Sequence, residues 1–232
     1  MIKSTLYITL FATILLGFSS CKKENTAANN ITSGSEYFSS LVGMTRLYQV
    51  DSIYWDDFFN AHDTISYQVK EVIPSSYFDN QNRITQRIER YLKNPITGEW
   101  IIWKVWHANI TNSTAELVED NIRYLKFVIN PTLNATWNGN TYNNLDVMYY
   151  KITALNVADF SGNNSYASTL KISQYDDENL NAIHRNFDEE RYAKGVGLYY
   201  RTNEHYEKVL NPSSIKSGYI YTETLLSYSY HP

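Results

Sequence analysis

The stretch ISYQVKEVIPSSYFDNQNRITQRIERYL (residues 65–92) decides the fold of this chain. Apolar residues alternate with polar ones in two runs: Ile65, Tyr67, Val69 and Ile73 against Ser66, Gln68 and Lys70, and Ile84, Ile88 and Leu92 against Thr85, Arg87 and Glu89. A period of two is typical of a β-strand with one face buried. Between the two runs, the sequence DNQN at 79–82 supplies residues that favour a turn. The stretch therefore predicts two antiparallel strands joined as a hairpin.

Similar runs, separated by turn residues, recur along the rest of the chain. We expect further strands at 100–110, 122–129, 145–157, 168–175, 197–202 and 219–230, and one short helix at 177–187. No second linker and no internal repeat interrupts residues 36–232. The sequence therefore predicts a single antiparallel all-β domain over 36–232, built as a curved sheet, half-barrel or barrel with little helix.

Two short segments predict tight backbone turns between strands. Asn138-Gly139 favours a turn with positive φ, and the two glycines of KGVG (194–197) favour a bulge or tight bend where a side chain would clash.

The segment EWIIWKVWHANI (99–110) is apolar on both faces. A strand of this kind is covered on both sides or lines a cavity with one face.

Composition narrows the class of partner. The chain has 232 residues, 43% of them hydrophobic, with 21 Tyr and 5 Trp, which is ample for a packed β core. Its formal charge is −4 and no basic block occurs, which argues against nucleic acid as a partner.

The amino-terminal residues predict export. Lys3 precedes an apolar run over 6–18, which is too short to cross a bilayer as a helix, since this needs about 20 residues. The following residues, GFSSC (17–21), end on the one cysteine of the chain, and a polar segment follows to residue 35. We interpret 1–20 as a signal peptide and 21–35 as a flexible tether.

The segment GFSSC resembles the lipobox of bacterial lipoproteins, although Phe18 stands where Leu is common. The resemblance implies cleavage between Ser20 and Cys21 and lipidation of Cys21 by diacylglyceryl and further acyl chains such as palmitate. Several acyl chains are sufficient for stable anchoring. The resemblance implies that the protein is held in the cell envelope of a Gram-negative bacterium, at the outer membrane, on either its periplasmic or its surface face.

Four further stretches resemble a family of uncharacterised lipoproteins from Bacteroidota: YFSSLVGMTRLYQVDSIYWDDF (37–58), TWNGNTYN (136–143), RYAKGVGLYYR (191–201) and IKSGYIYTETLLSY (215–228). The family has no assigned reaction, so the resemblance implies a curved antiparallel fold and no activity. It also implies O-glycosylation at Asp-Ser/Thr-apolar motifs, which here are Ser52 and Thr64.

The residues give no positive sign of catalysis. No His, Cys or Gly-rich motif for a metal, nucleotide or nucleophile occurs, so we expect no metal and no cofactor. The acidic clusters at 56–57, 176–178 and 188–190 are interpreted as solvated turns or faces, because neighbours on a strand point to opposite faces. Paired carboxylates acting on a polysaccharide remain the alternative, so whether the chain is an enzyme stays open.

Aromatic residues favour a binding role. Trp and Tyr stack on sugar rings and line apolar pockets. Most of the five tryptophans are expected in the core, with Trp137 the best candidate for exposure and ligand stacking, followed by Trp55. We therefore expect a non-catalytic binding or structural lipoprotein whose partner, besides the membrane, is a glycan, a lipid or another envelope protein.

Overall fold

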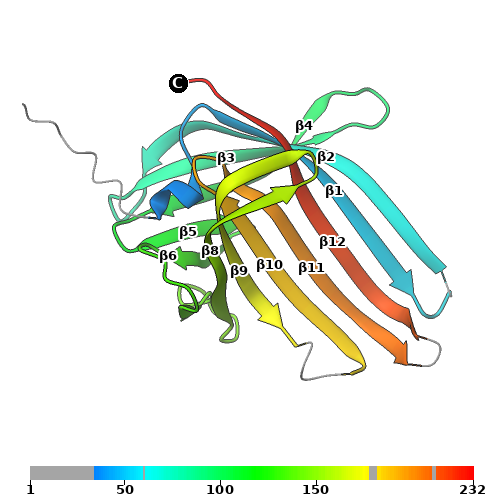
Figure 1. The fold of residues 1–232 in the computed structure, drawn as a ribbon. Coiled ribbons are helices and arrows are strands. Elements are labelled where there is room, and N and C mark those ends of the chain that lie inside the picture. Colours follow the sequence, from blue (N-terminus) through cyan, green and yellow to red (C-terminus); the bar gives the residue numbers. More distant parts are fainter. Residues whose placement is uncertain (1–33, 60, 178–181, 211–212) are drawn as a thin grey trace, which may run out of the picture. The chain divides into compact units, whose positions relative to one another are not determined.

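The computed structural model describes residues 34–59, 61–177, 182–210 and 213–232. They form one antiparallel sheet of twelve strands and a short 3-10 helix, η1 (Ser35–Phe38), so the all-β prediction is confirmed (Figure 1). The strands are β1 (Met44–Asp56), β2 (Ala61–Phe78), β3 (Ile84–Lys93), β4 (Trp100–Ile110), β5 (Thr114–Glu119), β6 (Ile122–Val128), β7 (Thr136–Asn138), β8 (Tyr149–Ser161), β9 (Asn164–Asp176), β10 (His184–Ala193), β11 (Gly197–Leu210) and β12 (Ser213–Tyr230). Within these ranges no helix is long and apolar enough to span a membrane.

The sheet curves until its two edge strands meet. Its order is β6-β5-β4-β3-β2-β1-β12-β11-β10-β9-β8-β7, so consecutive strands pair throughout except β6 and β7, which are the two edges, and β1 pairs with β12 in the middle of the sheet. At the edges, Leu125 N–H of β6 donates to Gly139 O at 2.9 Å, and the Trp137 indole N–H donates to Leu125 O at 3.0 Å. These bonds make a nearly closed, barrel-shaped sheet.

Alternation along β1 defines an inner and an outer face. Met44, Arg46, Tyr48 and Val50 are buried, and the residues between them are partly exposed. We call the face that carries these four residues the inner face. Directly opposite residues of antiparallel strands share a face, so the pairing register assigns the neighbouring strands to it.

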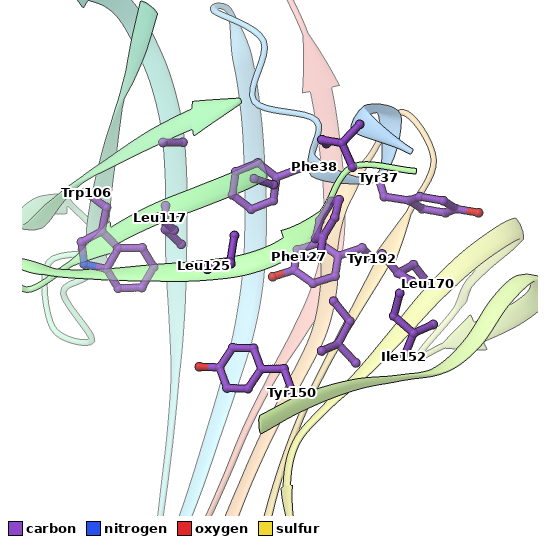
Figure 2. Close-up of a cluster of buried hydrophobic side chains, with 14 of the residues drawn as sticks. Tyr37, Phe38, Trp106, Leu117, Leu125, Phe127, Tyr150, Ile152, Leu170 and Tyr192 are labelled. Carbon is purple, nitrogen blue, oxygen red and sulfur yellow. The ribbon is translucent and has the colours of Figure 1, made fainter. Parts of the chain in front are cut away.

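Aromatic side chains from opposite parts of the sheet fill one end of its interior (Figure 2). Phe127 of β6 packs edge-on against Phe38 of η1 and Tyr192 of β10, with ring centroids 5.7 and 5.6 Å apart. Each of these rings is at most 7% exposed. The helical turn η1 therefore closes this end, and the Glu36 carbonyl accepts a hydrogen bond from Gly195 N–H at 2.8 Å.

The KGVG segment makes the tight turn between β10 and β11 that the sequence predicted. Gly195 and Gly197 both have positive φ, at 72° and 93°. A Cβ on Gly197 would lie 2.6 Å from an Arg46 guanidinium nitrogen. Glycine is therefore required both by the backbone and by the inward arginine.

Several expected elements differ from the structure. The helix predicted at 177–187 is wrong in its described part, because His184–Phe187 begins β10; residues 178–181 lie outside the described residues. Strands β1, β5, β7 and β10 were not expected. The strand expected from 145 begins only at Tyr149.

The apolar strand β4 is covered over only part of its length. Trp106 is buried as expected, but Ile101, Ile102 and Trp103 are 41–52% exposed. The reason is that β5 pairs only with residues 107–110, so the first half of β4 has β3 alone beside it.

Candidate functional site

Charged residues on the inner face form a buried ionic network with two parts. In the first part, Arg46 of β1 donates to Glu71 of β2 at 2.7 Å, and Arg90 of β3 bonds to Glu223 of β12. Glu71 joins them, with Arg90 Nε 3.7 Å from its carboxylate. All four are at most 8% exposed. The two cations and two anions are balanced, which is the condition under which charges tolerate burial.

The second part is a separate cluster of four charged residues. Lys126 of β6 lies 2.6 Å from Glu119 of β5 and 2.8 Å from Glu190 of β10. Arg201 of β11 lies 3.1 and 2.7 Å from the same two carboxylates. Tyr192 also donates to Glu190 at 2.5 Å. Four strands from the two halves of the sheet, β5 and β6 on one side and β10 and β11 on the other, thus bring two cations and two anions together.

The cations of this cluster set the ionisation of its carboxylates. Burial alone would raise the pKa of Glu119 and of Glu190, but Arg201 and Lys126 outweigh it and hold both pKa values below the usual range. Burial opposes the charge of Lys126 as well, and the two carboxylates reverse this and raise its pKa. All of these groups are therefore charged at neutral pH.

A polar cavity of about 360 Å³ lies against this cluster. Its lining includes Glu119, Lys126, Glu190 and Arg201. Further lining side chains carry hydrogen-bonding groups or apolar surface: Asn140, Asn203, Asp188, Tyr124, Tyr150 and Met148. The volume falls in the range of small-molecule sites, about 300–1,000 Å³. The cavity therefore offers many hydrogen-bond donors and acceptors beside a cluster whose charges cancel.

His205 and Asp188 fix the geometry of one cavity wall. His205 Nε2 lies 2.8 Å from Asp188 Oδ1, and its Nδ1 lies 3.1 Å from Asn186 Oδ1. Asn203 donates to the same Asp188 oxygen at 2.5 Å. Because both ring nitrogens face oxygen acceptors, the protonated imidazolium is favoured. The hydrogen bond to Asp188 is the main cause that raises the pKa of His205, against the effect of burial.

We expect this arrangement to make stability depend on pH. A pKa raised by folding stabilises the protein fully below the unfolded-state pKa of about 6.5, and the stabilisation is lost as pH rises through the folded-state pKa. NMR titration of the imidazole should give a His205 midpoint above 6.5, and Asp188→Asn should lower it. A His205 midpoint at or below 6.5 in the unmodified protein would contradict this assignment.

The tryptophans predicted for ligand stacking do not lie together. Trp137 is buried at 8% exposure, with its indole N–H on Leu125 O, so its predicted exposure is wrong. Trp137 lies in β7, at the seam where the two edge strands β6 and β7 meet, and this contact covers its ring. Trp55 is half-buried at the end of β1, and alternation places it on the outer face, away from the cavity.

The predicted modification sites lie in different places. Ser52 is on the inner face of β1, opposite Ile65, whereas Thr64 of β2 is exposed on the outer face. Thr64 is the more exposed of the two, and glycosylation of both residues stays a prediction. Ser20 and Cys21 lie outside the described residues.

The interpretation of residues 188–190 as a solvated cluster is wrong for all three. Asp188 and Glu190 are 8% and 1% exposed on the inner face. Glu189 points to the outer face, where it is 9% exposed and pairs with Arg191 at 2.5 Å. Carboxylates two positions apart on a strand share a face, and this signal was hidden by the expected helix. His205 lies next to the cavity lining, where it contacts Asp188.

No known protein family and no curated protein sequence matches this chain. Two solved structures are similar to it. One is from Bacteroides fragilis and is described as an exported protein with a YmcC-like fold; it is 8% identical, with a TM-score of 0.45, over 83% of this chain and 98% of that chain. The other, described as a lipoprotein from Parabacteroides distasonis, is 9% identical, with a TM-score of 0.38 and the same coverage. Neither likeness says what this chain binds.

Proposed function

We propose that this chain is an exported lipoprotein, held at the cell envelope through Cys21, whose β-sheet binds a glycan without chemically changing it. The polar cavity beside the Glu119–Lys126–Glu190–Arg201 cluster carries the proposal. It offers amide, carboxylate and phenol groups together, which is the set that hydrogen-bonds a ligand rich in hydroxyl groups.

The charges of the cavity favour a ligand without net charge. Glu119 and Glu190 are paired with Lys126 and Arg201, and Asp188 is paired with His205. A charged ligand would compete with these pairs, whereas hydroxyl groups can use the remaining lone pairs and N–H groups. An acyl chain would instead cover polar groups without satisfying them, at a cost of about 1–3 kcal/mol per group.

The ionisation of the carboxylates favours binding over hydrolysis. A glycoside hydrolase needs one carboxylic acid that stays protonated, and therefore a raised pKa. The two carboxylates that face one another across shared cations, Glu119 and Glu190, both have lowered pKa values. This supports a binding role, with paired-carboxylate hydrolysis as the alternative that release of reducing sugar would reveal.

A glycan array tests the proposed binding. The protein, purified in detergent, is applied to an array on which α-glucan, β-glucan, mannan, xylan, N-acetylglucosamine and uronate series are each printed at one to six residues. We expect binding to at least one neutral series and loss of about tenfold or more in affinity for Asn203→Leu, because the cavity wall loses its amide. Asn80→Leu, in an exposed turn, should bind normally. Binding to none of the series, or equal binding by Asn203→Leu, would overturn the proposal.

The anchor is tested separately by Cys21→Ser. Since Cys21 is the one cysteine of the chain, the variant should incorporate no alkyne-labelled palmitate and should leave the membrane fraction. The unmodified protein is the control, and both are followed by labelling and fractionation. Labelling of the Cys21→Ser protein would refute lipidation at this residue.

A further inference from the structure

Beyond the cavity, the inner face continues as a sheet across five strands. β10, β11, β12, β1 and β2 are adjacent in the sheet, and Figure 1 shows their ends extending beyond β5 and β6. The pairing register defines which side chains line this extension, because directly opposite residues share a face.

The first row across these strands begins in the cavity. It runs through Asp188, Asn203, Tyr221, Ser52 and Ile65, one residue per strand. Asp188 and Asn203 are also cavity lining. The cavity and the row are therefore one continuous surface.

The second row lies two residues further toward the strand ends. It runs through Asn186, His205, Tyr219, Tyr54 and Asp63. Tyr54 and Tyr219 are 51% and 40% exposed. The His205 ring packs on Tyr219 with centroids 5.4 Å apart while its Nε2 contacts Asp188, so this histidine connects the tyrosines to the cavity wall.

We call Tyr54, Tyr219 and Tyr221 the tyrosine strip. The two outer-face rows through Thr202 and Phe187 contain no aromatic ring except Phe187, which Arg185 covers at 4.4 Å, whereas Tyr206 and Trp55 lie in the next outer row toward the strand ends. The outer face at these rows includes Thr202, Thr222 and Asp51 instead. At the level of these rows, the exposed Tyr54 and Tyr219 therefore lie on the face that continues from the cavity.

We propose that the tyrosine strip is an extended subsite that binds further residues of an oligosaccharide whose first residue lies in the cavity. This inference rests on the proposed function. Four inter-strand spacings separate Asp188 from Ile65, about 19 Å, which is several times the width of one sugar ring. A chain of sugars therefore matches the surface, and a single sugar does not.

The chemistry of the rows selects the oligosaccharide over other occupants. Tyrosine rings present flat apolar faces on which the C–H faces of sugars stack. Groups that hydrogen-bond hydroxyls lie on one side of both rows, at Asn186, Asn203 and Asp188, and the second row ends on Asp63 at the other side. An acyl chain would cover the remaining lone pairs and N–H groups of these residues without hydrogen-bonding to them.

Affinity measured against chain length tests the strip. Calorimetric titration uses the six-residue and one-residue members of the glycan series that binds the full protein. We expect the six-residue glycan to bind at least tenfold more tightly than the single sugar. Tyr54→Ala and Tyr219→Ala should each weaken six-residue binding by about threefold to tenfold, the range typical of one aromatic contact, and leave single-sugar binding unchanged. Tyr149→Ala, a 71% exposed tyrosine of β8, is the matched control and should change neither.

The outcomes separate the two proposals. If the six-residue glycan binds no more tightly than the single sugar, or if both tyrosine variants bind it normally, the strip is not a subsite and cavity binding still stands. If no member of any series binds, the proposed function itself fails, and the subsite with it. If decanoate vesicles or a protein bind at the strip and no glycan displaces them, the assignment of the strip to an oligosaccharide is overturned.

Discussion

Replacing Glu223 by alanine is expected to lower the free energy of unfolding by about 3–5 kcal/mol, a large part of the stability of a domain. Glu223 is fully buried and bonds to Arg90, which is itself 2% exposed. Without it, Arg90 keeps only Glu71, 3.7 Å away, and that carboxylate already binds Arg46. Two buried arginines would then share one carboxylate. Urea unfolding followed by circular dichroism measures the change.

A double variant shows whether the effect comes from the unpaired charge. Glu223→Leu with Arg90→Met removes both charges, so it should be less destabilised than Glu223→Ala. Lys104→Ala is the matched control, because its pair with Asp120 is solvent-exposed and contributes only about 0–1 kcal/mol. If Glu223→Ala unfolds at the same urea concentration as Lys104→Ala, the network does not stabilise the sheet as described.

Replacing Trp106 by alanine is the second large effect, again about 3–5 kcal/mol of unfolding free energy. Trp106 is 5% exposed, and its ring lies between two arginines of the network, 4.2 Å from the Arg90 guanidinium and 5.8 Å from that of Arg201. The substitution therefore leaves a cavity and removes a cation–π contact from each arginine. The midpoint temperature of thermal unfolding and the midpoint urea concentration should both fall.

Trp103 provides the matched control three residues earlier on the same strand. Its ring is 41% exposed, so Trp103→Ala should cost less than about 1 kcal/mol. The loss of unfolding free energy for Trp106→Phe should lie between those for Trp103→Ala and Trp106→Ala, because phenylalanine fills part of the space that tryptophan occupied. Equal destabilisation by Trp103→Ala and Trp106→Ala would contradict the assignment of Trp106 to the core.

Most strands could be predicted from the alternation of side chains, and the ones that were missed have a physical explanation. β1 carries Arg46 at an inward position, where an apolar residue is expected. Its charge is neutralised by Glu71, which comes from the next strand. A local pattern cannot show a partner 25 residues away, so the inward arginine interrupts the apolar period.

The turn at Asn138-Gly139 shows how a motif can be right for a different reason. We predicted a positive φ there, yet Gly139 is not among the residues with positive φ. A Cβ at Gly139 would instead lie 2.2 Å from the Tyr150 ring. The glycine is required by close packing at the seam, which also buries Trp137. Such long-range contacts are invisible in the sequence of the turn.

The candidate site could be predicted least. Its wall combines Asp188 and Glu190 of β10 with Asn203 of β11, and His205 of β11 supports Asp188 from beside the wall. The spacing of two in each pair is a sign of a shared face, but only once both segments are known to be strands. The cavity also needs Lys126 from the opposite edge of the sheet, which closure alone brings near.

A crystal structure of the protein grown with the six-residue glycan that binds most tightly on the array tests the central claim most directly. The account predicts one sugar hydrogen-bonded to Asp188 and Asn203 in the cavity and a following sugar ring stacked on Tyr219. A glycan bound elsewhere, such as at Trp55 on the outer face, with the inner face empty, would contradict it.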